Sequence, residues 1–300
     1  MRGLRVDAGE SERPVPPGFP TDWPQRRLSR FVDAAGLHWH VQCASAGPVL
    51  LLLHGTGAAA SSWRGLLPLL ATHFTVVAPD LPGHGFTSEM PGGVARLPEV
   101  AQAIAGLMRA LKLAPDFIVG HSAGAAIAAQ MALFETPRVQ RMAWLGGALR
   151  PLGGVAGRIG SPLARALSRN AFFTRLAAWR ADDDAAVRRF LAATGSTLDA
   201  DGVAVYRTLL RRHEHIAGAL KMMGGWDLAP LQRALPQLAQ PVLLMHGERD
   251  LTVAPAQSHE LARQLPHARL ELLPGLGHLA HEERPVDVAR RLAQWCLAPG

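Results

Sequence analysis

Residues 117 to 124 read Phe-Ile-Val-Gly-His-Ser-Ala-Gly, and this stretch decides the fold. Phenylalanine, isoleucine and valine favour a strand, and the small residues from 123 to 129 favour a helix that follows at once. Ser122 falls at the turn between them, where its backbone needs a strained conformation with positive φ. Gly120 and Gly124, two residues to either side, leave room for strand and helix to approach. The stretch therefore predicts a serine hydroxyl that projects from a tight strand-to-helix corner.

A serine presented in this way is typical of the nucleophile elbow of α/β-hydrolases. Strands and helices alternate around it. We expect strands over 48–53, 74–79, 141–145, 241–245 and 269–273, helices over 61–70, 97–111, 255–265 and 285–297, and a hairpin over 29–41. This alternation predicts an α/β fold with a mostly parallel, doubly wound sheet. Its active site should lie at the carboxyl ends of the strands.

The alternation is interrupted once. Residues 148–227 contain arginine-rich helical segments and no convincing strand, and an insertion between two strand ends predicts a helical lid over the catalytic edge. Residues 1–24 carry charges and five prolines and are expected to form a mobile arm. The hydrolase core would then comprise residues 25–147 and 228–300.

Composition narrows the class of protein. Of 300 residues 48% are apolar, which suits one large domain with an insertion. The first twenty residues are polar and no run of 18 apolar residues occurs, so we expect no signal peptide and no membrane span. Cys43 and Cys296 are isolated, which favours a reducing, cytoplasmic compartment without a metal cluster. We expect neither a cofactor nor a bound metal.

The net charge of +7 comes almost wholly from arginine, with lysine only at positions 112 and 221. An excess of arginine over lysine together with abundant alanine, glycine and proline also follows from genomic base bias, and no nucleic-acid-binding module is visible. We therefore expect no nucleic-acid partner.

A serine nucleophile needs a base, and the base needs an acid that orients it. In the α/β-hydrolase arrangement the chain order is serine, acid, histidine, with the last two in loops after later strands. Asp250 and His278 follow the strands over 241–245 and 269–273. They are predicted to form a triad with Ser122, and Glu248 is the weaker candidate for the acid.

The oxyanion of an acyl-transfer reaction needs backbone donors, which are typically worth about 3 kcal/mol each. The loop after the first buried strand reads His-Gly-Thr-Gly from residue 54. We expect the amides of Thr56 and Ala123 to form the oxyanion hole. Three other histidines lie inside turn motifs and not at base positions, and structural roles are expected for them: His54, His84 and His121.

These features, spread over residues 29–297 outside the lid, resemble the α/β-hydrolase superfamily, and in particular lidded haloperoxidase-like esterases and carbon–carbon bond hydrolases. Haloalkane dehalogenases and epoxide hydrolases have aspartate at the position of the nucleophile, whereas this sequence has serine at position 122. A closer resemblance lies in stretches that the superfamily does not dictate. These are GLHWHVQ from residue 36, GTGAAASSW from 55, VGHSAGAAIA from 119, TGSTLDADGVAVY from 194, GALKMMGGWDLAPL from 218 and LPGLGHLAHEERP from 273.

Together, from about Trp23 to the end, these stretches resemble the α/β-hydrolase-like magnesium chelatase accessory proteins of bacteriochlorophyll biosynthesis. The resemblance implies a role near the insertion of magnesium into protoporphyrin, with chelatase subunits as partners. It does not supply a reaction.

The predicted lid fits such a ligand. Between residues 150 and 212 there are eleven arginines against five aspartates, interleaved with aromatic residues. Arginine suits carboxylates and aromatic faces suit a flat macrocycle, so a tetrapyrrole with two propionates is a sensible ligand. The alternative is a set of amphipathic helices whose arginines face water. The candidate substrate-binding residues are Phe172, Trp179 and Met222.

His213 and His215 could ligate a metalloporphyrin, but residues two apart do not share a helix face, and an exposed surface is the favoured interpretation. Two functions remain open. One is a serine hydrolase, acting on a tetrapyrrole ester or on a general ester or carbon–carbon bond. The other is a protein that holds or delivers a porphyrin.

Overall fold

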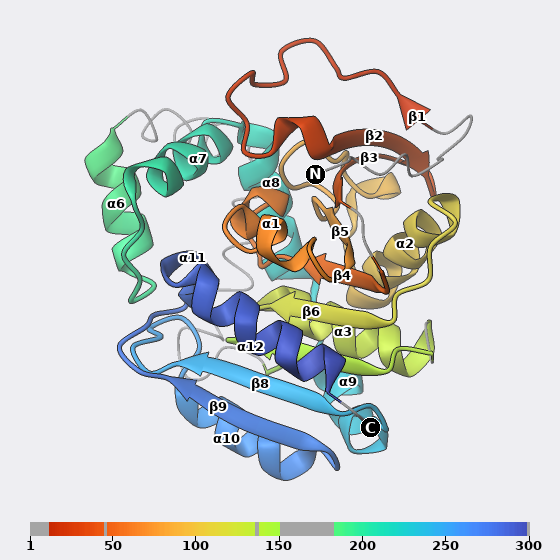
Figure 1. Cartoon of the computed structure of the whole chain (residues 1–300). Helices are drawn as coiled ribbons and strands as arrows, with labels where there is room; N and C mark the ends of the chain where they lie inside the picture. The colour runs from red at the N-terminus through yellow and green to blue at the C-terminus, as the bar shows by residue number, and fades with distance from the viewer. Residues whose placement is uncertain (1–11, 45–46, 136–137, 151–182, 299–300) are drawn as a thin grey trace.

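The structure is a computed structural model that describes residues 12–44, 47–135, 138–150 and 183–298. Its strands form one sheet in the order β1-β2-β3-β5-β4-β6-β7-β8-β9 (Figure 1). The strands are β1 (Glu12–Arg13), β2 (Ser29–Ala34), β3 (Leu37–Ala44), β4 (Val49–Leu53), β5 (Thr75–Pro79), β6 (Phe117–His121), β7 (Arg141–Leu145), β8 (Val242–Gly247) and β9 (Ala268–Leu273). Pairing is antiparallel from β1 through β3 to β5 and parallel from β5 to β9. The prediction of a mostly parallel α/β sheet is confirmed.

Helices cover both faces of the sheet. They are α1 (Leu67–Leu70), α2 (Leu97–Ala110), α3 (Ala123–Phe134), α6 (Asp184–Ala192), α7 (Ala200–Leu210), α8 (His213–Gly225), α9 (Ala229–Ala234), α10 (Pro255–Gln264), α11 (Ala280–Glu283) and α12 (Pro285–Leu297). Apolar side chains of α2, α3, α9 and α10 join one core cluster, and those of α1 and α12 join another. The sheet therefore separates two hydrophobic layers.

Strand β4 explains why its sequence is apolar without interruption. Leu51 and Leu53 belong to the cluster on one face, whereas Leu50 and Leu52 belong to the cluster on the other. Because successive side chains of a strand point to opposite faces, a strand covered on both sides needs apolar residues at every position.

One expected helix is broken. In place of a single helix over 61–70 the chain forms a 3-10 helix, η3 (Ala60–Trp63), and the short α1. Gly65 lies between them, and a Cβ atom there would approach Pro285 Cβ to 2.6 Å. The close packing against the start of α12 therefore fixes a glycine where a continuous helix would place a side chain. The other expected elements occur within a few residues of their predicted bounds.

The mobile arm expected over residues 1–24 is not observed where the structure describes it. Strand β1 pairs with β2, and the side chains of Phe19 and Trp23 are buried. The Phe19 ring packs edge-on against Phe31, at 5.3 Å between centroids, and also against Phe86. Aromatic burial therefore anchors a segment whose proline content alone indicates mobility; residues 1–11 lie outside the described ranges.

Between β7 and β8 the described residues form helices α6 to α9, with no strand among them. In Figure 1, α6 lies to the left, on the side toward which the arrows of β6 and β8 point. The boundary of a lid at residues 148–227 remains a prediction. Two of its proposed substrate contacts, Phe172 and Trp179, lie outside the described residues.

Both cysteines are buried as free thiols. Burial raises the pKa of Cys43 and of Cys296 to about 12. Within the described ranges, no helix combines the length and apolarity needed to cross a membrane.

Candidate active site

Ser122 occupies the corner between β6 and α3, with φ 51° and ψ −117°. This is the backbone with positive φ that the sequence predicts. A Cβ atom at Gly120 would collide with the carbonyl oxygen of Gly124, and one at Gly124 would collide with that of Leu53. The two glycines are therefore required because helix α3 starts against the backbones of β6 and β4.

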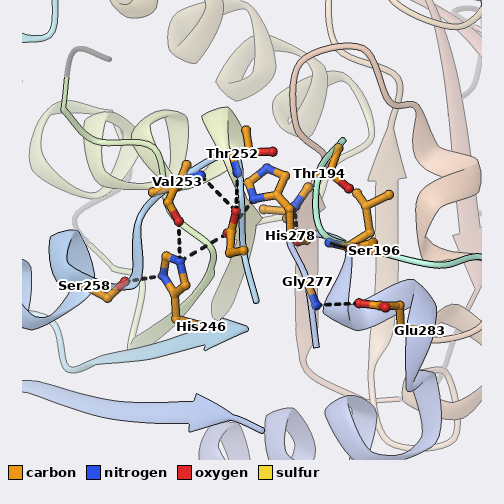
Figure 2. A network of polar contacts seen from close by, with 12 residues as sticks. Thr194, Ser196, His246, Thr252, Val253, Ser258, Gly277, His278 and Glu283 are labelled. Atoms are coloured by element: carbon orange, nitrogen blue, oxygen red, sulfur yellow. Dashed lines mark hydrogen bonds and ion pairs between the residues drawn. The ribbon is translucent and has the colours of Figure 1, made fainter. Parts of the chain in front are cut away.

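Asp250 and His278 are brought together although they follow different strands. His278 Nδ1 donates a hydrogen bond to Asp250 Oδ2 at 2.7 Å. The other carboxylate oxygen accepts the backbone N–H groups of Thr252 at 2.8 Å and Val253 at 2.9 Å (Figure 2). Glu248, the alternative acid, is exposed. The orientation of the Asp250 carboxylate is thus fixed on both of its oxygens.

A second histidine touches the same carboxylate. His246 Nε2 lies 3.1 Å from Asp250 Oδ2, and His246 Nδ1 lies 2.6 Å from Ser258 Oγ. Burial would raise the pKa of Asp250, but the hydrogen bonds from His246 and His278 hold this pKa well below its usual range. The carboxylate is therefore ionised at neutral pH, as the orienting acid of a triad must be.

The backbone after β7 links this pair to the serine corner. The N–H of Ser122 donates to the carbonyl of Leu145 at 2.9 Å. A Cβ atom at the next residue, Gly146, would lie 3.1 Å from both Asp250 Oδ2 and His278 Nδ1. Ser122 and the Asp250–His278 pair therefore flank the same two residues, and Gly146, at φ 51°, has no side chain to obstruct them.

The loop that follows β4 runs beside Ser122, since a Cβ atom at Gly55 would lie 2.9 Å from Ser122 Cβ. The backbone N–H groups of Thr56 and Ala123, the predicted oxyanion donors, have no acceptor among the described residues. The Thr56 hydroxyl donates to Met222 Sδ at 3.4 Å. Met222, the one proposed substrate contact that the structure describes, is therefore buried against the loop of the predicted oxyanion hole.

His215 differs from its expected exposure. It is buried at the start of α8, where Nδ1 accepts the N–H of Gly85 at 3.0 Å and Nε2 donates to the carbonyl of Gly57 at 3.1 Å. Burial lowers its pKa to about 4, so the imidazole is neutral. The helix can approach this closely because Gly218 packs directly on the backbone of Gly83. His213, two residues earlier, is partly exposed.

The three histidines for which structural roles are expected are all buried; His121 is the last residue of β6, and His54 and His84 lie in loops. His54 Nδ1 donates to the carbonyl of Gly55 at 2.8 Å, and His84 Nδ1 donates to that of Pro82 at 3.1 Å. His121 Nε2 donates to the carbonyl of His278 at 3.0 Å. Burial lowers the pKa of each imidazole, which keeps these rings neutral.

A model of the α/β hydrolase fold matches residues 48–285. The chain belongs to the α/β-hydrolase fold family. This α/β-hydrolase is 37% identical over 282 residues to the magnesium-chelatase 30 kDa subunit of Rhodobacter capsulatus, a match that covers 93% of this chain and 98% of that protein. It is 32% identical over 264 residues to a pimeloyl-[acyl-carrier protein] methyl ester esterase of Xanthomonas campestris pv. campestris, covering 84% and 97%.

Among solved structures, a thermophilic esterase from Thermogutta terrifontis superposes on the α/β-hydrolase with a TM-score of 0.69. The two chains are 23% identical, and the match covers 86% of this chain and 93% of that one. This similarity shows a shared fold and nothing about activity.

Proposed function

We propose that this α/β-hydrolase is a serine hydrolase in which Ser122 is the nucleophile, His278 the general base and Asp250 the orienting acid. The observation that carries the proposal is the 2.7 Å hydrogen bond between Asp250 and His278, beside a serine at positive φ. His278 donates from Nδ1, so its Nε2 is the nitrogen that is free to accept the proton of a serine hydroxyl.

In this mechanism Ser122 Oγ attacks the acyl carbon while its proton passes to His278. The oxyanion of the tetrahedral intermediate would accept the N–H groups of Thr56 and Ala123, each worth about 3 kcal/mol of transition-state stabilisation. Collapse of the intermediate breaks the bond to the leaving group, which takes the proton from His278. Water then attacks the acyl-enzyme by the reverse sequence, and the acid product leaves.

The similarity to the magnesium-chelatase 30 kDa subunit supports a tetrapyrrole as the molecule on which this site acts. We place the protein near the insertion of magnesium into protoporphyrin in bacteriochlorophyll biosynthesis, with chelatase subunits as partners. Met222 would contact the substrate from the lid, together with Phe172 and Trp179. The reaction that fits both the site and this setting is hydrolysis of a tetrapyrrole ester.

A second candidate is a lidded hydrolase of general carboxylic esters or carbon–carbon bonds. The 32% identity to a pimeloyl-[acyl-carrier protein] methyl ester esterase favours this candidate, because the ester in that protein's name is not a tetrapyrrole. The two candidates share the same catalytic residues and differ in the ligand that the lid accepts.

The test is covalent labelling with a fluorophosphonate probe, followed by mapping of the modified residue. Wild-type protein should be labelled on Ser122, and Ser122→Ala should lose both labelling and esterase activity while it keeps its circular dichroism spectrum. Ser88→Ala, which removes a hydroxyl from the loop after β5, is the matched control and should label normally. Equal labelling of wild type and Ser122→Ala would remove Ser122 as the nucleophile.

A further inference from the structure

The turn between α6 and α7 contacts both loops that carry the proposed acid and base (Figure 2). The carbonyl oxygen of Thr194 accepts the N–H of Leu251, next to Asp250, and the N–H of His278 itself, each at 3.2 Å. A part of the inserted helical segment therefore joins two loops of the core that follow different strands, β8 and β9.

The residues on either side of His278 are held from the same turn. Leu279 N–H donates to Ser196 Oγ at 2.8 Å, and the Ser196 side chain is buried. Gly277 N–H donates to Glu283 Oε2 at 2.8 Å, while the other oxygen of Glu283 accepts the N–H of Thr197 at 3.0 Å. Three consecutive N–H groups, those of residues 277–279, thus have acceptors that belong to the 194–197 turn or are bonded to it.

The approach of the turn depends on glycines. Gly195 has φ 82°, and a Cβ atom there would collide with the carbonyl oxygen of Arg249. Arg249 lies in the loop after β8 that carries Asp250, which we call the acid loop. A Cβ atom at Gly277 would collide with the backbone of Gly195 and with Ser196 Oγ. The turn and the two loops are therefore in direct backbone contact. A displacement of the turn would displace the two loops as well.

We propose that Ser196 and Glu283 are positioning residues for His278, and that they couple the placement of the inserted segment to the alignment of the base. This inference rests on the proposed function, in which His278 takes the proton of Ser122. If the turn moves away, the N–H groups of His278 and Leu279 lose their acceptors, and Glu283, which accepts the N–H of Gly277, loses its bond from Thr197. The loop that holds the imidazole is then less constrained. Misplacement of a catalytic group by about 1 Å can cost on the order of 100-fold in rate.

The experiment compares Ser196→Ala, Glu283→Gln and the double variant with Glu248→Gln. Glu248 is exposed in the acid loop, so its variant removes the same charge near the site without touching the turn. Glu283→Gln keeps one acceptor oxygen, and Ser196→Ala changes little volume, so that at least one variant should fold. The readouts are the rate of fluorophosphonate labelling of Ser122, kcat and KM for a p-nitrophenyl ester, and deuterium exchange of the amides at 277–279.

We expect each single variant to lower the labelling rate and kcat about tenfold, with KM changed by less than threefold, and to speed exchange at 277–279. Glu248→Gln should behave as wild type. Wild-type labelling rates in the folded double variant would overturn the inference and leave the serine-hydrolase proposal intact. If wild-type protein is not labelled on Ser122 at all, both fall.

Discussion

His246 Nε2 lies 3.1 Å from Asp250 Oδ2, on the same oxygen that accepts the hydrogen bond from His278. The His246 ring is wholly buried, and its Nε2 also lies 2.9 Å from the carbonyl oxygen of Val253. Because the carbonyl can only accept, Nε2 carries the proton, and Ser258 can then donate to Nδ1. The ring therefore has a single orientation, in which Nε2–H donates to the Val253 carbonyl and also faces Asp250 Oδ2, the oxygen that accepts from His278.

Replacing His246 tests that role. His246→Leu removes the donor and should lower kcat/KM for a p-nitrophenyl ester at least tenfold. His246→Gln offers an amide N–H near the position of Nε2, so it should recover most of the loss. Activity would be measured alongside thermal unfolding, because both variants disturb a buried residue. Equal activity of the leucine and glutamine variants would show that the donor is immaterial.

Asp250→Asn should reduce kcat by roughly 10⁴-fold, since an amide in place of the carboxylate leaves the histidine of a triad in the wrong tautomer. Steady-state kinetics on the folded variant check this, with Glu248→Gln as the matched control, expected to be unchanged. An unchanged kcat in Asp250→Asn together with a large loss in Glu248→Gln would instead identify Glu248 as the acid.

Stability should fall on mild acidification because His215 is neutral in the folded protein. Burial lowers its pKa from 6.5 to about 4, whereas the unfolded chain binds the proton at the ordinary value. The stabilisation is therefore complete above about pH 6.5 and is lost as the pH falls to about 4, a difference of about 3 kcal/mol at 1.36 kcal/mol per pKa unit.

Urea unfolding at several pH values between 7 and 4 measures this dependence. His215→Gln should flatten it, whereas His213→Gln, at a partly exposed position, should not. Other buried histidines, including His281, whose pKa burial lowers to about 3, act in the same direction, so some dependence should persist. Parallel curves for wild type and His215→Gln would contradict the prediction.

Protoporphyrin or its magnesium complex should quench tryptophan fluorescence saturably, with a Kd in the micromolar range or below, equivalent to about −8 kcal/mol. Binding should weaken as salt rises, because lid arginines would attract the propionates. Ser122→Ala should still bind, which separates recognition from catalysis. A protein that hydrolyses small esters but shows no saturable quenching would leave the general ester or carbon–carbon hydrolase as the function.

Most of the fold could be predicted from local sequence patterns. The elbow is specified by glycines two residues from Ser122, and the order of strands and loops was enough to select Asp250 and His278 as residues that meet. These inferences succeed because strand propensity and parallel topology together determine which loops share an edge of the sheet.

The contacts that the sequence did not indicate are all long-range. The hydrogen bond between Gly85 and His215 joins residues 130 positions apart in the sequence, and the one between Ser196 and Leu279 joins residues 83 positions apart. Gly65 interrupts a helical pattern because Pro285 packs on it. Likewise, no periodicity marks Phe19 as an anchor within a proline-rich stretch. Such features depend on which surfaces meet after folding.

The two native thiols have a practical consequence. With pKa values of about 12, Cys43 and Cys296 carry almost no thiolate at neutral pH, and maleimides react with the thiolate. A cysteine introduced on the exposed side of α7 or α8 would therefore be the one site that takes up a spin label or a dye. Pairs of such labels could follow the distance between these helices and the sheet by electron resonance or energy transfer, in a protein that keeps both of its own cysteines.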